Sequence, residues 1–256
     1  MPRVYLDAPG GSQVPARVVE RMGEVMVRSC ANDGGAFRTS RDTDRIVAEA
    51  HAAAAAFLGA AGPDEIVFGL NSTSLIFHFS RMLSRDWRPG DEIVLTRMDH
   101  DGNVGPWLAA AAERGVTVRW LDFDPDTFEY RYEQLDELVN PRTRLVACNH
   151  ASNIFGTVND VARIVAAGRA AGAVTMVDAV QSAPHLPLDV AAIGCDLMAC
   201  SAYKFFGPHA GLLYVRAVLR DRLTPLKVRP SSWDMPWRLA RWTPSFEAEA
   251  GTEVVI

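Results

Sequence analysis

Short apolar runs alternate along this chain with stretches in which apolar residues recur at helical spacing. The apolar runs are predicted strands, at residues 65–69, 92–96, 116–121, 145–149, 174–178, 197–201 and 212–215. The stretches between them are predicted helices, at residues 46–58, 74–83, 105–114, 132–138 and 161–171. Alternating strands and helices predict an α/β fold with a mainly parallel, seven-stranded sheet flanked by helices.

This pattern weakens after Val215. Residues 224–246 contain four prolines and three tryptophans, and residues 253–256 are predicted to begin a strand. We therefore expect a large domain over residues 1–223, followed by a connecting segment and the start of a truncated C-terminal small domain over 224–256. Residues 1–15 could pack with that small domain.

Composition excludes several classes of protein. The chain has 256 residues, 48% of them hydrophobic, which suffices for a large domain with a full core. Its net charge of -5 predicts neither a nucleic-acid partner nor a polybasic membrane surface. No apolar run approaches the ~20 residues of a membrane span, and the N-terminus has no signal-peptide pattern. We therefore expect a cytoplasmic protein without a membrane partner.

The cysteines do not suggest a metal site or a disulfide. Cys30, Cys148, Cys195 and Cys200 form no C-x-x-C pair, and two of them lie in apolar runs. We interpret them as buried free thiols and expect no metal.

Lysine is scarce, and this narrows the candidates for amine chemistry. Of 26 basic residues only Lys204 and Lys227 are lysines, and arginine cannot supply a neutral, nucleophilic amine. Lys204 follows a predicted buried strand and precedes Phe205 and Phe206, whereas lysine usually occupies solvated surfaces. We predict that desolvation by these rings lowers the pKa of Lys204.

A small polar turn, formed by Asn71, Ser72 and Thr73, follows the first predicted strand and opens a helix. Ligands of open α/β sheets bind outside the carboxyl ends of the strands. Free N–H groups and the positive end of a helix dipole suit a phosphate there. The same residue types are also common N-caps, so the turn alone does not establish a phosphate site.

Three further polar residues lie at or just beyond predicted strand ends. Asp178 ends one strand and Gln181 follows three residues later. A carboxylate there could keep a pyridinium nitrogen protonated, or could simply cap a turn. His100 follows another strand and could stack on an aromatic cofactor or transfer protons, although a lone histidine is more often structural.

Taken in order, these segments resemble the class V aminotransferase group of fold-type I pyridoxal phosphate (PLP) enzymes, and within it the cysteine desulfurase family. The resemblance covers essentially the whole chain. Its motifs are Tyr5-Leu6-Asp7 with Pro9-Gly10-Gly11 (an opening strand and turn), Asn32-Asp33-Gly34-Gly35, Asn71-Ser72-Thr73, Asp99-His100, Ser152-Asn153, Asp178-Ala179-Val180-Gln181, Ser201-x-x-Lys204 and Gly251-Thr252.

The resemblance implies a role for each matching residue. Lys204 forms the Schiff base with pyridoxal 5'-phosphate, with Tyr203 beside it, and His100 stacks on the ring as a second catalytic residue. Asp178 binds the pyridine nitrogen, Gln181 the phenolic oxygen, and Asn153 lies near cofactor and substrate. The phosphate is held by Asn71, Ser72, Thr73 and Ser201, with Thr252 reaching the phosphate of the partner subunit.

The implied activity is removal of sulfur from L-cysteine by a homodimer with active sites at its interface, with a sulfur-acceptor protein as a further partner. Tyr203 and Asp101 stand where the family usually has histidine, which resembles a desulfurase-like branch. The family's persulfide-forming cysteine and carboxylate-binding arginine lie in the C-terminal domain, and none of the four cysteines matches that position.

Several alternatives remain open on the same scaffold. They are a C–S lyase, an epimerase, an aminotransferase and a non-catalytic PLP-binding fragment, because the cofactor supplies the shared carbanion chemistry. A nucleotide-dependent oxidoreductase is disfavoured, since no G-x-G-x-x-G follows the first strand.

Overall fold

One seven-stranded sheet organises the chain. The computed structural model describes residues 4–241 and 243–256, and its strands lie in the order β1-β7-β6-β5-β4-β2-β3. Their bounds are β1 Ile66–Gly69, β2 Glu92–Thr96, β3 Thr117–Leu121, β4 Thr143–Asn149, β5 Val174–Asp178, β6 Leu197–Ser201 and β7 Gly211–Val215. Strand β7 runs antiparallel to both of its neighbours, β1 and β6, and the other neighbouring pairs are parallel. The predicted seven-stranded, mainly parallel sheet is confirmed.

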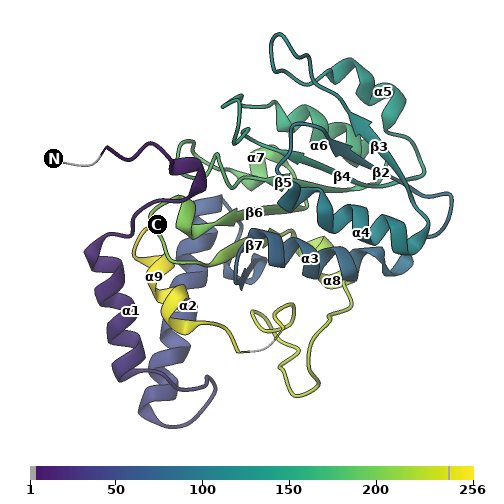
Figure 1. Cartoon of the computed structure of the whole chain (residues 1–256). Coiled ribbons are helices and arrows are strands. Elements are labelled where there is room, and N and C mark those ends of the chain that lie inside the picture. The colour runs from purple at the N-terminus through teal and green to yellow at the C-terminus, as the bar shows by residue number, and fades with distance from the viewer. Residues whose placement is uncertain (1–3, 242) are drawn as a thin grey trace.

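The helices cover both faces of this sheet (Figure 1). Their bounds are α1 Ala16–Arg28, α2 Arg38–Leu58, α3 Ser72–Leu83, α4 Gly105–Arg114, α5 Leu135–Leu138, α6 Val161–Ala170, α7 Val190–Ile193, α8 Ala217–Arg222 and α9 Phe246–Glu253. The five predicted helices are present. The beginning predicted for α2 was wrong, because its first two turns are polar and carry no apolar periodicity.

Alternate strand residues enter two separate cores. Ile93 of β2 packs in a cluster with α3 and α4, around the fully buried Trp107, whereas its neighbour Val94 faces a cluster with α2 and α6. Burial on both faces explains why these strands are nearly continuous apolar runs. This layering leaves the carboxyl ends of the parallel strands along one edge.

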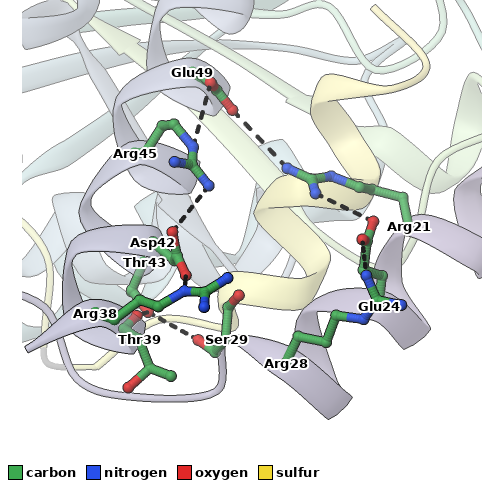
Figure 2. A network of polar contacts seen from close by, with 10 residues as sticks. All are labelled: Arg21, Glu24, Arg28, Ser29, Arg38, Thr39, Asp42, Thr43, Arg45 and Glu49. Carbon is green, nitrogen blue, oxygen red and sulfur yellow. Dashed lines mark hydrogen bonds and ion pairs between the residues drawn. The ribbon is translucent and has the colours of Figure 1, made fainter.

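The helices α1, α2 and α9 pack together beside the sheet (Figure 1). Val25, Ile46 and Phe246, one from each helix, share a small apolar cluster. Figure 2 shows the polar contacts of α1 and α2, where Arg21 lies 3.9 Å from Glu49 across the two helices. Exposed ion pairs of this kind contribute at most about 1 kcal/mol each. The apolar contacts therefore dominate this association.

Two local predictions at the chain ends were wrong. Residues 253–256 do not begin a strand: α9 extends to Glu253, and its N-terminus is capped by Ser245, whose side chain accepts from the Ala248 N–H at 3.3 Å. Residues 4–7 form no strand, and the first regular element is a 3-10 turn at Ala8–Gly10. Helix α9 is stabilised by its packing against α1 and α2, which local periodicity does not reveal.

The cysteines are free thiols. Cys148, Cys195 and Cys200 are buried as expected, but Cys30 is exposed, because it lies in the loop between α1 and α2. No helix of residues 4–241 and 243–256 combines the length and apolar character needed to cross a bilayer.

Candidate active site

A cavity of about 220 Å³ lies at the carboxyl edge of the sheet. Eight residues singled out from the sequence line it: Ser72, Thr73, His100, Asn153, Asp178, Gln181, Tyr203 and Lys204. They come from the segments after β1, β2, β4, β5 and β6, so the parallel strands deliver them to one place. Five lining residues were not predicted: Pro9, Gly10, Asn149, Ala151 and Val180.

The N-terminus of α3 forms one wall of this cavity. Asn71 is its N-cap, and its side chain accepts from the Ser74 N–H at 2.8 Å. The Ser72 N–H donates to Ser201 Oγ at 3.0 Å, and the Ser201 hydroxyl lies 3.0 Å from the Ser72 hydroxyl. Within the described residues the Thr73 N–H makes no hydrogen bond. A free amide at the positive end of a helix dipole favours an anion.

This wall depends on a close approach between two backbones. A Cβ atom on Gly211, the first residue of β7, would lie 2.4 Å from the carbonyl carbon of Asn71. Glycine is therefore required for β7 to pass behind the α3 N-terminus.

Asp178 is buried at the end of β5, and 6% of its surface is exposed. Burial raises the pKa of Asp178, opposed by a hydrogen bond from the Val180 N–H, 2.8 Å from Oδ1, and by the positive charge of Lys204. His100 accepts the Gly102 N–H on Nδ1 at 2.9 Å, so the proton of the neutral ring lies on Nε2. Asp178 is thus a buried acceptor with two basic groups nearby.

Lys204 ends the 3-10 turn Ala202–Lys204 that follows β6. Its amine donates to the carbonyl oxygen of Pro9, which also accepts from Gln181 Nε2 at 3.1 Å. Burial lowers the pKa of Lys204, opposed by Asp7 and Asp178. The direction expected from the sequence is confirmed.

The expected cause of that shift was wrong. Phe205 turns into the core and packs on Phe57 with ring centroids 5.1 Å apart, and Phe206 is 54% exposed. The amine of Lys204 instead lies 5.1 Å from the ring centroid of Tyr203. The other lysine, Lys227, contacts the carbonyl oxygen of Ser232 and lines no part of this cavity.

Residues 9–12 lie against the loop that carries Lys204. The Ser12 N–H and hydroxyl both donate to the carbonyl oxygen of Tyr203, at 2.9 and 3.0 Å, and the Phe206 N–H donates to Ser12 Oγ at 2.6 Å. The Tyr203 ring stacks on His209, with centroids 4.8 Å and planes 20° apart. The N-terminal segment thereby fixes the backbone on both sides of Lys204.

Three predicted residues lie outside the cavity lining. Asn71 and Ser201 are directly behind it, where they position Ser72. Thr252 is fully buried in α9, and its hydroxyl donates to the Ala248 carbonyl oxygen at 2.7 Å. Because its role concerns a partner subunit, it stays a prediction.

The sequence contained a partial indication of the residues that were missed. Asn149 ends a predicted strand, and Ala151 and Val180 lie in loops already noted, so adjacency to a strand end could have identified them. Pro9 and Gly10 reach the cavity only through tertiary contacts with Gln181 and Lys204.

The comparisons with known proteins agree with this geometry. The model of the family "Aminotransferase class-V" matches residues 4–256. The chain is 37% identical over 230 residues to an aminotransferase-like protein of Gibberella zeae, covering 88% of this chain and 56% of that protein. It is 33% identical over 258 residues to a cysteine desulfurase of Dickeya dadantii, covering 95% of this chain and 62% of that protein.

Solved structures give the same result. The apo cysteine desulfurase of Thermococcus onnurineus matches with a TM-score of 0.91 and 27% identity, covering 98% of this chain and 65% of that one. The cysteine desulfurase CsdA of Escherichia coli matches with a TM-score of 0.87 and 28% identity, over 98% and 66% of the two chains. The chain thus spans about three fifths of the length of the relatives it matches. It belongs to the class V aminotransferase family.

Proposed function

We propose that this chain is the cofactor domain of a cysteine desulfurase-like enzyme that removes sulfur from L-cysteine with PLP on Lys204. The class V aminotransferases are PLP-dependent enzymes. The observation that carries the proposal is the arrangement of the Lys204 amine and the buried Asp178 carboxyl in one cavity, walled by the N-terminus of α3. The Lys204 amine would be the attachment point of the cofactor, and the Asp178 carboxyl would accept from its protonated ring nitrogen. The N-terminus of α3 would bind its phosphate.

The residues present fit this cofactor. Ser72 and Thr73 would hold its phosphate at a helix N-terminus with a free Thr73 N–H, and Ser201 would position Ser72 from behind the cavity wall. Asp178 would bind the ring nitrogen, since it is the buried carboxyl of the cavity lining. PLP, when bound, withdraws electrons from the α-carbon of an attached amino acid.

The chain's own groups would handle the protons. Lys204 acts as the general base at the α-carbon, and its lowered pKa increases the fraction of neutral amine at neutral pH. The side-chain amide of Gln181 donates to Pro9 in this structure. With PLP bound, it would donate to the phenolic oxygen of the cofactor. His100 presents an Nε2 proton and a ring face, and Asn153, which lines the same cavity, would lie near the substrate.

We further propose a homodimer whose interface adjoins the cavity, with a sulfur-acceptor protein as a second partner. Three exposed apolar side chains lie within two residues of predicted site residues: Leu70 (72% exposed), Ile154 (76%) and Phe206 (54%). Burying them against a second copy would remove apolar surface from water. Sedimentation equilibrium tests the dimer: an Ile154→Glu variant should shift it to monomer, whereas a wild-type monomer at high concentration refutes it.

The cofactor proposal is tested by borohydride trapping after incubation with PLP. We expect an absorption band from bound cofactor and one labelled lysine, Lys204, by peptide mapping. Lys227→Arg is the matched control and should label normally, while Lys204→Arg should not. Labelling only at Lys227, or no labelling, overturns the proposal.

The reaction is tested separately, with L-cysteine and the PLP-loaded protein. Release of sulfide equivalents together with alanine supports desulfuration. Pyruvate and ammonia would instead identify a C–S lyase, D-cysteine an epimerase, and a keto acid with aminated cofactor an aminotransferase. Bound PLP without any product would identify a binding fragment.

A further inference from the structure

A chain of polar side chains ends at Asn149 of β4, which is the register partner of Asp178 on the adjacent strand β5. Asp99 Oδ2 contacts the hydroxyl of Thr96, and Tyr130 Oη lies 2.9 Å from the same hydroxyl. The other contact of Tyr130 Oη is the side-chain oxygen of Asn149. The four side chains come from β2, the segment after it, the segment before α5 and the end of β4. They therefore form one continuous series from Asp99 to Asn149.

The orientation of Asn149 fixes the far end of this series. Its Nδ2 faces two carbonyl oxygens, those of Met98 at 3.1 Å and Ala151 at 3.4 Å. Its Oδ1 also accepts from Asn159 Nδ2 at 3.0 Å. The atom that faces Tyr130 is therefore an oxygen, which can only accept.

The number of hydrogens available along the series then determines the protonation state of its other end, Asp99. Tyr130 has one hydroxyl hydrogen, and it must point at Asn149 Oδ1. Tyr130 Oη is consequently the acceptor in its contact with Thr96, which uses the only hydroxyl hydrogen of Thr96. The contact between Thr96 and Asp99 then has no hydrogen unless Asp99 provides it.

We propose that Asp99 is a carboxylic acid in the folded protein, donating to Thr96, so that the neighbouring Asp99 and Asp178 carry a single negative charge, located on Asp178. The other oxygen of Asp99 accepts from Asn103 Nδ2 at 3.2 Å, as a protonated carboxyl can. Among the described residues no basic side chain forms an ion pair with Asp99.

The surroundings of Asp99 agree with this assignment. The titratable groups facing it are Asp178, Tyr130 and Cys148, none of which is a cation. Desolvation raises the pKa of Asp99 well above its usual value, and the charge of Asp178 raises it further. The pKa of Asp178 is also raised, but the positive charge of Lys204 acts against that rise. The proton therefore belongs on Asp99.

The consequence for the site rests on the proposed function. If Asp178 binds a protonated ring nitrogen, a second anion beside it would hold the proton on that nitrogen too tightly. In the site without cofactor, two adjacent buried carboxylates would repel each other and destabilise the fold. A neutral Asp99 acts as a positioning residue: it holds Thr96, Tyr130 and Asn149 in place without adding charge. Asn149 in turn lines the cavity.

Infrared difference spectroscopy of the protein without added cofactor tests the assignment directly. The wild type at neutral pH should show one protonated-carboxyl C=O band that shifts with ¹³C-aspartate labelling. The band should disappear in Asp99→Asn, whose amide can still donate to Thr96 and accept from Asn103. If it persists there and disappears in Asp178→Asn, or if no such band exists, the proposal is overturned.

A second variant tests the hydrogen count and retains Asp99. In Tyr130→Phe the Thr96 hydroxyl is free to donate to Asp99, so the carboxyl band should titrate at a lower pH than in wild type. An unchanged titration contradicts the assignment. In PLP-loaded Tyr130→Phe, the negative charge gained when Asp99 ionises should raise the pH midpoint of the change in cofactor absorbance. If the wild-type protein does not bind PLP, the proposed function is refuted, but the infrared result on Asp99 still stands.

Discussion

The amine of Lys204 donates a hydrogen bond to the backbone carbonyl oxygen of Pro9, which lies 195 residues earlier in the chain. Because the acceptor is a main-chain atom, no side-chain substitution at position 9 removes it. Gln181 donates to the same oxygen at 3.1 Å, so an N-terminal turn gathers two site residues. This contact holds the amine inside the cavity, where burial lowers its pKa.

The first prediction concerns the pH dependence of Lys204 reactivity. Folding lowers the pKa of its ammonium group below the usual lysine value of 10.5, so the neutral amine becomes available at lower pH than for an exposed lysine. Lys227→Arg leaves Lys204 as the only lysine, and its reaction with PLP can be followed by absorbance against pH. The midpoint should lie below that of N-acetyl-lysine amide; a midpoint at or above it contradicts the burial of the amine.

The second prediction concerns Ser201. Ser201→Ala removes the acceptor of the buried Ser72 N–H, which should cost about 1–3 kcal/mol of stability and weaken PLP binding about tenfold. Binding of pyridoxal, which lacks the phosphate, should change little. Ser182→Ala, at an equally buried hydroxyl bonded to the Ala179 carbonyl at 3.2 Å, is the control for stability. Equal losses for both ligands would argue against a phosphate role.

The third prediction concerns two glycines. Gly211→Ala places a methyl group 2.4 Å from Asn71 backbone and should destabilise the fold by about 1–3 kcal/mol or more, displacing the α3 N-terminus. Gly23→Ala, inside α1 with no atom within 4 Å of the new Cβ, should instead stabilise by about 0.5–1 kcal/mol. Urea unfolding measures both free energies. An unchanged stability of Gly211→Ala would show that the two backbones can move apart at little cost in free energy.

The fourth prediction concerns the stability of the chain against pH. Glu249 is 2% exposed, and its Oε2 has no hydrogen-bond partner in the described part of the chain. Burial, then repulsion from Asp33 and Glu247, raises the pKa of Glu249 from 4.5 to about 8. The folded state therefore holds the proton more tightly than the unfolded state, so stability present below about pH 4.5 is lost as the pH rises towards 8.

The loss should amount to about 1.4 kcal/mol per pH unit, and to no more than about 5 kcal/mol in total. Glu249→Gln should remove most of this dependence and be more stable than wild type at pH 8.5, as judged by urea unfolding. Glu253→Gln, at the other end of the same helix, is the control and should keep the wild-type slope. Parallel profiles for wild type and Glu249→Gln would exclude a protonated Glu249.

Much of the site was predictable because its residues lie at strand ends. Parallel strands buried on both faces are continuous apolar runs, so their carboxyl ends can be located by inspection, and His100, Asp178 and Lys204 each follow such a run. The polar turn before α3 was identified by its capping residues. These are local properties, which sequence spacing records.

Helices α1 and α9 and the first turns of α2 were not predicted, α1 although its apolar residues do recur at helical spacing. Helix α2 begins with polar turns, and α9 is stabilised by packing against α1 and α2 rather than by periodicity of its own. The direction of the Lys204 pKa shift was foreseen from the scarcity and setting of that lysine, but Phe205 and Phe206 were the wrong cause.

By itself, the sequence determined the strand order along the chain, the α/β class and the identity of the one lysine suited to imine chemistry. Only the tertiary structure decided that Pro9 accepts from Lys204 and Gln181, and that Asp99 lies in a hydrogen-bond series with Thr96, Tyr130 and Asn149. The physical reason is that strand and helix patterns arise from neighbours in sequence. Desolvation and hydrogen-bond direction depend on which distant surfaces meet.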